Sequence, residues 1–186
     1  MSVDTVTTFF ALLAVLGIVF LLIVAGLGLF ATATGGASPS LREYRDSLGS
    51  LGLLLGFAVA LTCTLGSLYL SEVAKFPPCE LCWFQRIAMY PLTVIMGVAA
   101  LRRDYKVAFY SVPIAVVGLG ISIYHYLVER FPDDVGFACN TEVPCSTVWV
   151  WKFHFLSIPA MAGVGFLLVS TLSMIALKTN NPNREI

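Results

Sequence analysis

Five long apolar stretches constrain this chain more than any other feature of its sequence. They cover about residues 8–31, 49–70, 83–101, 107–128 and 156–177. Each approaches or exceeds the roughly 20 residues that a helix needs to cross a bilayer core about 30 Å thick. A segment in lipid must satisfy its own backbone polar groups, so we expect all five to be helices. With 58% hydrophobic and 12% charged residues, a soluble domain could not hide the apolar surface.

We therefore expect an all-α integral membrane protein, built as a four-helix transmembrane bundle with one extra N-terminal transmembrane helix. Residues 1–48 would hold the extra helix and a cytoplasmic connection, 49–177 the four-helix domain, and 178–186 a cytoplasmic tail. The first stretch could instead be a signal peptide cleaved after the Ala-Thr-Ala at 31–33. Residues 1–8 carry no Lys or Arg, however, and the apolar run exceeds a signal core, which favours a retained span.

The distribution of basic residues predicts the orientation in the cell (inner) membrane. One set of connections holds seven of them, namely Arg42, Arg45, Arg102, Arg103, Lys106, Lys178 and Arg184, and the other holds Lys75, Arg86, Arg130 and Lys152. The side richer in Lys and Arg stays in the cytoplasm. We thus expect the N-terminus outside and the C-terminus inside. The formal net charge is zero, so nothing suggests a nucleic-acid partner.

Four of the five cysteines form two close pairs, both on the predicted outer side. Cys79 and Cys82 lie at the mouth of the third apolar stretch, and Cys139 and Cys145 lie in the long polar connection before the fifth. An N-terminal helix position lowers a thiol's pKa, and the thiolate is the form that attacks a disulfide. Disulfides persist outside the cytosol. The pattern predicts two exchangeable disulfides that pass electrons between them.

The electron acceptor that this arrangement implies is a quinone. The sequence contains no flavin or nucleotide fingerprint. Reoxidising a thioredoxin-fold oxidase with a potential near about −120 mV requires an acceptor of higher potential, and a quinone dissolves in the bilayer. Arg86, one helical turn after Cys82, could hydrogen-bond a quinone carbonyl or simply extend to the headgroups. His125 could exchange protons with the quinone or anchor its span at the interface.

The cysteines could also have a structural role or bind a metal ion. Cys139–Cys145 could be a structural disulfide that stabilises the fold by about 2 kcal/mol. All four paired cysteines could bind zinc in a non-catalytic membrane protein. The wide second spacing and the oxidising compartment argue against zinc, so we predict no metal site. Cys63, inside the second apolar stretch, is expected to be a small packing residue.

Aromatic residues alternate just after the second cysteine pair. They are Trp149, Trp151, Phe153 and Phe155. A period of two suits a strand, while the same cluster beside a bilayer suits an interfacial aromatic belt. The sequence leaves both alternatives open.

The stretch from Pro77 to Pro91 resembles the signature of the DsbB family, the disulfide-bond-forming quinone reductases. The core of that signature is a Cys-x-x-Cys followed four residues later by Arg, and the short-loop relatives often called BdbC are most similar. Further similarities are Arg102-Arg103-Asp104, Tyr124-His125-Tyr126, and Pro144-Cys145 followed by tryptophans. The resemblance covers about residues 49–177.

This resemblance implies a route for electrons. A secreted or periplasmic thioredoxin-fold dithiol oxidase (DsbA-type) would attack the Cys139–Cys145 disulfide, and the freed thiol would attack Cys79–Cys82. Cys82 would then pass two electrons to ubiquinone or menaquinone, with Arg86 contacting the quinone. By order in the chain, Cys139 would face the partner and Cys145 would attack Cys79.

The chain departs from the family pattern twice. It has the extra N-terminal span, and its second cysteine pair is only six positions apart. The vitamin K epoxide reductase-like proteins also combine a Cys-x-x-Cys with a loop cysteine pair in a similar helical bundle. In those proteins the loop pair precedes the Cys-x-x-Cys, which is the reverse of the order in this chain.

Overall fold

A computed structural model describes residues 2–33, 39–133, 139 and 143–179, with side chains described for all of these except 39–46, 48 and 50. Five helices account for most of the described chain: α1 (Val3–Ala33), α2 (Pro39–Leu68), α3 (Glu80–Arg102), α4 (Ala108–Arg130) and α5 (Ile158–Thr179). Each contains one predicted span and is long and apolar enough to cross a membrane. No strand is formed within these described ranges, so the all-α prediction is confirmed.

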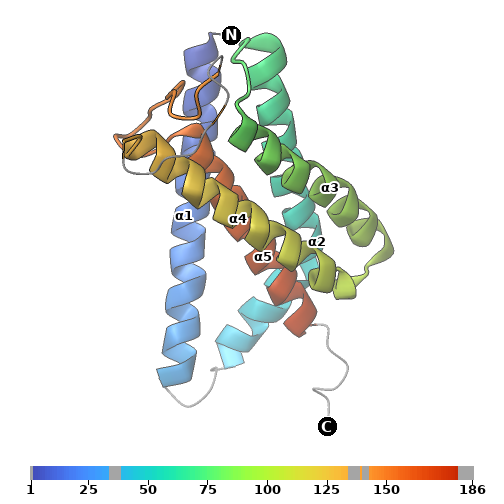
Figure 1. Ribbon diagram of the computed structural model, residues 1–186. Coiled ribbons are helices and arrows are strands. Elements are labelled where there is room, and N and C mark those ends of the chain that lie inside the picture. The colour runs from blue at the N-terminus through green and yellow to red at the C-terminus, as the bar shows by residue number, and fades with distance from the viewer. Residues whose placement is uncertain (1, 34–38, 134–138, 140–142, 180–186) are drawn as a thin grey trace.

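Helix α5 is the centre of the bundle. It packs along α4 and α2, while α3 packs against α2 and α4 (Figure 1). Phe166 and Val169 of α5 meet Leu92 and Met96 of α3 in a fully buried core. Small residues let the helices approach: a Cβ atom added at Gly52 of α2 would lie 2.9 Å from the backbone oxygen of Leu172.

Among the described contacts, helix α1 packs on the bundle mainly through its first half. Its buried Ala11 and Ala14 cluster with Leu156, just before α5. Further along α1, a Cβ atom at Gly26 or Gly28 would meet nothing within 4 Å. The last turns of α1 stand away from α5 in Figure 1. The extra helix therefore joins the other four near one end of the molecule.

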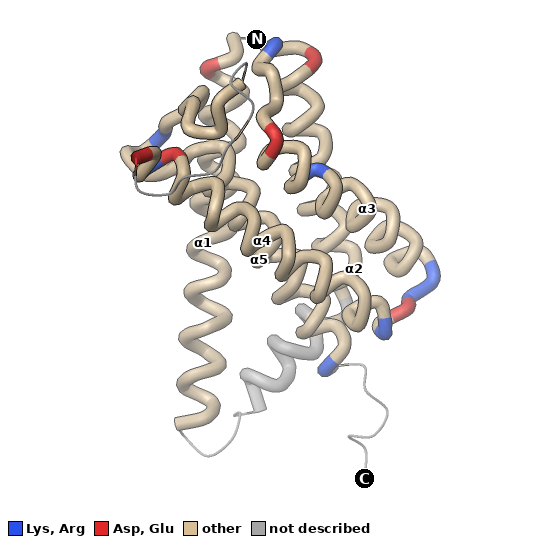
Figure 2. The backbone as a smooth tube through the Cα atoms, viewed as in Figure 1, with Lys and Arg blue, Asp and Glu red and all other residues tan. Residues whose placement is uncertain are grey.

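That end also carries the cysteine pairs, and we call it the cysteine end. There α2 continues into a π-helical turn, Tyr69–Val73, and an extended segment then leads to the start of α3. The N-terminus and the loop between α4 and α5 lie at the same end (Figure 1). Charged residues gather toward the two ends of the bundle, and the middle of the described chain is largely free of them (Figure 2).

The aromatic segment between α4 and α5 folds as a turn and not as a strand. Only an isolated bridge, Lys152 to Leu156, forms there. Phe153 and His154 adopt left-handed backbone angles, φ 51° and 65°, which reverse the chain. Trp149 instead stacks on Phe76, with ring centroids 5.1 Å apart. Of the two alternatives for this segment, the strand is wrong because the backbone reverses inside the alternating pattern.

Candidate active site

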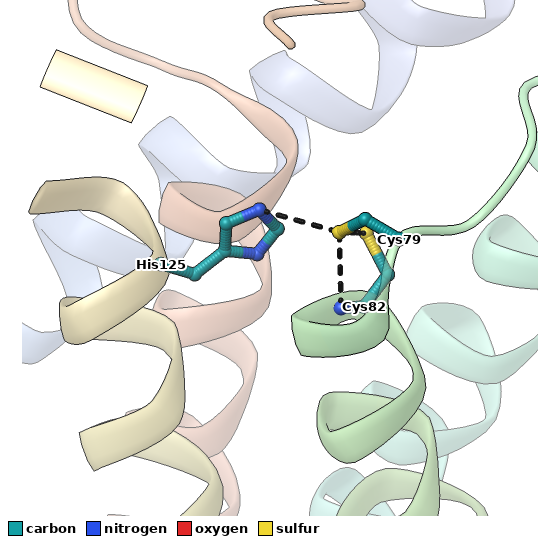
Figure 3. A group of neighbouring side chains, drawn as sticks. All are labelled: Cys79, Cys82 and His125. Atoms are coloured by element: carbon teal, nitrogen blue, oxygen red, sulfur yellow. Dashed lines mark hydrogen bonds between the residues drawn. The ribbon is translucent and has the colours of Figure 1, made fainter. Parts of the chain in front are cut away.

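The thiols of Cys79 and Cys82 meet at the first turn of α3. Cys79 is the N-cap residue of this helix, with an extended backbone, and its Sγ atom accepts a hydrogen bond from the Cys82 backbone N–H at 3.3 Å. The two Sγ atoms lie 2.8 Å apart, and both cysteines are free thiols (Figure 3). The helix N-terminus carries partial positive charge, which favours a thiolate at this position.

His125 of α4 reaches across to Cys79. Its Nε2 atom lies 3.6 Å from the Cys79 Sγ atom and 3.2 Å from the backbone oxygen of Cys145, while its Nδ1 atom lies 3.4 Å from Nε2 of Gln85. A carbonyl oxygen can only accept, so the imidazole proton belongs on Nε2. Nδ1 then accepts from the Gln85 amide. This buried chain of contacts aims an N–H group at the Cys79 sulfur (Figure 3).

These contacts stabilise Cys79 as a thiolate. The hydrogen bond from the Cys82 thiol is the largest cause, and the hydrogen bond from His125 adds to it. Together they outweigh the opposing effect of burial and lower the pKa of Cys79 to about 4, against an ordinary value of 9.0. At neutral pH, Cys79 is therefore present as the nucleophilic form of a thiol.

Cys139 and Cys145 form a disulfide with their Cα atoms 5.9 Å apart. Cys145 is only 2% exposed and packs in one cluster with Cys79, Leu81 and Val128, whereas Cys139 is half-buried at the edge of that cluster. The structure thus brings all four predicted cysteines together, with Cys145 on the inside and Cys139 toward the surface.

The disulfide bears on the zinc alternative. Because Cys139 and Cys145 are bonded to each other, the four-cysteine zinc set does not form. A smaller set remains: ligand atoms of Cys79, Cys82 and His125 all lie within 4.8 Å of one another. Two sulfurs and one imidazole are a donor set that a soft metal ion accepts.

A cavity of about 480 Å³ opens on the other side of Cys82, between α1, α2, α3 and α5. Cys82, Gln85 and Arg86 line its polar end, and the rest of the wall is mostly apolar. Arg86 is held in place by Ser67, whose Oγ and backbone oxygen accept hydrogen bonds of 2.9 and 3.0 Å. The guanidinium also lies over the Trp83 ring, 5.2 Å from its centroid. Polar donors beside a long apolar wall fit the ring and tail of a quinone.

Comparison with known proteins identifies the relatives of this chain. Residues 50–176 match the family model described as "Disulfide bond formation protein DsbB". The chain belongs to the DsbB family. It is 41% identical over 136 residues to the "Probable disulfide formation protein C" of Bacillus cereus, covering 72% of this chain and 97% of that protein. It is 47% identical over 118 residues to the "Disulfide bond formation protein C" of Bacillus subtilis, covering 63% and 86%. No solved structure matches the chain.

Membership of the DsbB family, together with five apolar helices, makes the chain an integral membrane protein with a disulfide-forming oxidoreductase role. Its short-loop resemblance is confirmed by the disulfide formation protein C relatives. The family match begins at residue 50, so α1 (Val3–Ala33) lies outside it.

Three further residues at this DsbB-family site were not predicted from the sequence. Gln85 supports the His125 ring, and Ser67 anchors Arg86. Glu129 follows His125 by one helical turn on α4, and its Oε2 atom is buried. An acidic residue four positions after a histidine on one helix face was the signal available for Glu129. His125 itself does not line the cavity and meets it only through Gln85, so its binding of a quinone stays a prediction.

Proposed function

We propose that this chain is a thiol:quinone oxidoreductase that reoxidises an extracytoplasmic thioredoxin-fold dithiol oxidase. Electrons would pass from the partner to Cys139–Cys145, then to Cys79–Cys82, and finally to a membrane quinone. One observation carries the proposal: Cys79 and Cys145 share a buried cluster and the same His125 Nε2 atom, while Cys82 borders the amphipathic cavity. Each cysteine pair thus has its own neighbour on the proposed path.

The proposed orientation places the cysteine end outside the cell membrane. Among the described side chains, Arg102 and Lys178 lie in the last turns of α3 and α5, and Arg103 and Lys106 lie in the connection from α3 to α4. Lys75, Arg130 and Lys152 belong to the cysteine end. The remaining predicted cytoplasmic residues, Arg42, Arg45 and Arg184, fall outside the described side chains. The positive-inside rule supports a cytoplasmic position for the far end.

The first half of the reaction is a series of thiol–disulfide exchanges. A thiolate of the partner attacks Cys139, the more accessible sulfur, and releases Cys145 as a thiolate. Cys145 attacks Cys79 of the oxidised first pair and releases Cys82. The partner's second thiol resolves its mixed disulfide with Cys139, and Cys139 then recaptures Cys145. Two electrons have then moved to Cys79 and Cys82, which are thiols, and Cys139 is again bonded to Cys145.

The second half requires an oxidant in the cavity. A bound quinone would accept two electrons and two protons there. Arg86, with N–H groups left over after binding Ser67, would donate hydrogen bonds to a carbonyl oxygen of the ring. Cys82 is the sulfur that faces the cavity, and the Cys79 thiolate lies 2.8 Å away, ready to close the disulfide. Ubiquinone and menaquinone rings both meet these requirements.

Turnover by the purified chain tests this function. The donor is a reduced thioredoxin-fold oxidase, and the loss of quinone absorbance reports the reaction. We expect Cys82→Ser and Cys139→Ser each to abolish turnover. If only Cys82→Ser does so, the second pair is structural and the partner meets the first pair directly. If the unaltered chain reduces no quinone with any thioredoxin-fold donor, the proposed function is wrong.

The three-ligand set of Cys79, Cys82 and His125 favours one other candidate function, the binding of a soft metal ion. Metal analysis of the purified chain distinguishes the two. About one zinc per chain, with Cys79 and Cys82 unreactive toward alkylating reagents, would indicate a metal protein. Metal-free chain with two reactive thiols would indicate the oxidoreductase.

A further inference from the structure

Helix α1 forms much of one wall of the cavity beside Cys82. The lining includes its residues Phe10, Leu13, Ala14, Gly17 and Phe20. The cavity also reaches Thr7 of the same helix, and the distance from Thr7 to Phe20 along α1 is about 20 Å. Since the family match begins at residue 50, this wall is an addition to the shared four-helix domain.

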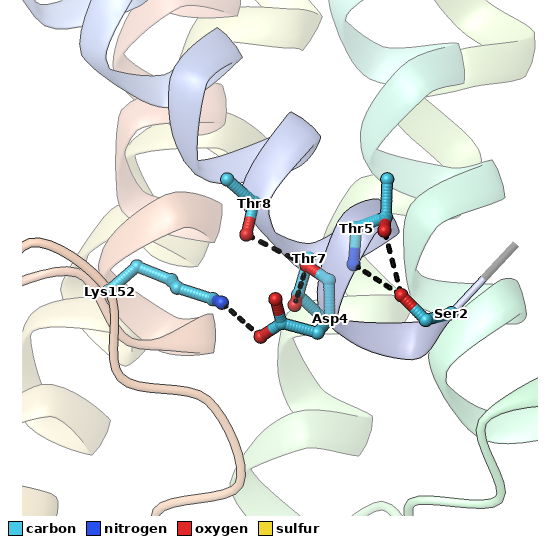
Figure 4. A network of polar contacts seen from close by, with 6 residues as sticks. All are labelled: Ser2, Asp4, Thr5, Thr7, Thr8 and Lys152. Carbon is cyan, nitrogen blue, oxygen red and sulfur yellow. Dashed lines mark hydrogen bonds and ion pairs between the residues drawn. The ribbon is translucent and has the colours of Figure 1, made fainter.

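The contacts of α1 hold this wall in place at the cysteine end. Lys152, in the loop before α5, donates a hydrogen bond of 2.5 Å to the Asp4 carboxylate near the start of α1 (Figure 4). At Gly17, an added Cβ atom would lie 2.8 Å from the Leu168 side chain, so α1 lies close against α5. A surface ion pair alone contributes little, and the close packing supplies most of the attachment.

Phe10 carries the wall across to α2. A Cβ atom added at Gly66 would lie only 3.0 Å from the Phe10 ring, so the ring covers that glycine. Gly66 is next to Ser67, which binds Arg86. Phe10 therefore stands where the polar end of the cavity becomes apolar. Its neighbour Phe9 is 54% exposed and does not line the cavity.

The arrangement suits one occupant, the isoprenoid tail of a quinone. The charged donor of the cavity, Arg86, lies at the end near Cys82, and the cavity continues along α1 with mostly apolar side chains. The hydroxyl groups of Thr7 and Thr62, which also line it, donate to backbone oxygens of their own helices. A molecule that fills it needs a polar ring at one end and a long apolar chain at the other. The last turns of α1 leave the bundle, which lets such a chain pass into the bilayer.

We propose that the first half of α1 is a tail-binding wall that gives this chain its affinity for long-tailed quinones, with Phe10 as the specificity-determining residue. The inference rests on the proposed function, because it assumes that a quinone ring lies beside Cys82 and Arg86. It adds a role for a helix that the four-helix domain does not contain.

Equilibrium binding tests this role with a matched pair of variants, Phe10→Ala and Phe9→Ala. Trp149 lines the cavity, so its fluorescence should be quenched by a bound quinone. Each protein is titrated with an isoprenoid quinone and with the same ring lacking a tail. Removing the Phe10 ring should weaken binding of the tailed quinone about fivefold to tenfold, because the apolar contact between the ring and the tail is lost. Thermal unfolding and the milder variant Phe10→Leu, expected to retain most of the affinity, report whether the fold is kept.

The outcomes separate this inference from the function on which it rests. A loss confined to Phe10→Ala and to the tailed quinone supports the wall. If both quinones lose affinity equally, if Phe9→Ala has the same effect, or if the cavity retains a phospholipid that the tailed quinone does not displace, the wall is overturned while quinone reduction by the unaltered chain still stands. If the unaltered chain neither binds nor reduces either quinone, both the inference and the proposed function are wrong.

Discussion

The Nε2 atom of His125 lies 3.6 Å from the Sγ atom of Cys79, although the two residues are 46 positions apart. The same nitrogen lies 3.2 Å from the backbone oxygen of Cys145. One histidine thus contacts both cysteine pairs at the point where a disulfide between them would form. Gln85 holds the ring from behind, at 3.4 Å.

Replacing His125 should make the Cys79 thiol less acidic. The Cys82 thiol and His125 together lower the pKa of Cys79 to about 4, with Cys82 the larger cause, so His125→Leu should raise that pKa without restoring the ordinary value. A thiol reacts as the thiolate, which is present above its pKa. Alkylation of Cys79 in the unaltered chain should therefore stay fast down to about pH 5. In the variant, the alkylation rate should begin to decrease at a higher pH as the solution is acidified.

The pH dependence of alkylation, followed by mass spectrometry of the Cys79 peptide, checks this. His154→Leu is the matched control, since His154 is an exposed residue of the loop. An identical pH profile for His125→Leu and the unaltered chain would show that the imidazole does not stabilise the thiolate.

Arg86 should matter through the shape of its guanidinium as well as its charge. Its guanidinium donates hydrogen bonds to the side-chain and backbone oxygens of Ser67, and its remaining N–H groups are available to a molecule in the cavity. Arg86→Gln should raise KM for the quinone by about 10- to 100-fold, because hydrogen bonds from a charged donor contribute about 1.5–3 kcal/mol. Arg86→Lys should recover only part of this, since an ammonium lacks the planar fork.

Ser67→Ala is the control for Arg86, because it removes one partner of the guanidinium and leaves the charge. We expect a smaller rise in KM than for Arg86→Gln. Equal KM values for Arg86→Gln and the unaltered chain would mean that Arg86 only packs against Trp83.

Two glycines of α4 should respond very differently to alanine. A Cβ atom at Gly118 would lie 2.3 Å from the Phe166 ring in the buried core, whereas one at Gly120 would meet nothing within 4 Å. Gly118→Ala should cost about 1–3 kcal/mol, because an overpacked core must shift. Gly120→Ala should be neutral or slightly stabilising, since alanine favours a helix. Thermal unfolding in detergent measures both, and similar stabilities would contradict the packing of Phe166 on α4.

The sequence predicted the five helices because length and hydropathy act locally. It also predicted the thiols at the start of α3, where Cys79 is the N-cap. The contact of His125 with Cys79 and Cys145 could not be predicted in this way. It depends on how α4 packs beside α3 and on the path of the loop that follows, and neither has a local signature.

The cavity shows the same limit. The sequence marked Arg86 from its spacing to Cys82, but its anchor, Ser67, lies 19 positions earlier on another helix. The contribution of α1 was missed because each of its apolar residues fits lipid as well as a protein wall. The alternating aromatics after Cys145 left a strand and an interfacial belt open. The φ values of 51° and 65° at Phe153 and His154 reverse the chain where a strand would continue, and the alternating pattern carries no signal for that reversal.

Trapping the disulfide between the two cysteine pairs tests the relay most directly. In Cys82→Ser the Cys79 thiolate has no partner of its own, and it can attack the Cys139–Cys145 disulfide beside it. We predict that a Cys79–Cys145 disulfide accumulates, and that mass spectrometry of non-reduced peptides finds it. The double variant Cys82→Ser/Cys145→Ser should lack this link. If Cys82→Ser keeps Cys139 bonded to Cys145, with Cys79 a free thiol even after reduction and slow reoxidation, the two pairs do not exchange and the relay is contradicted.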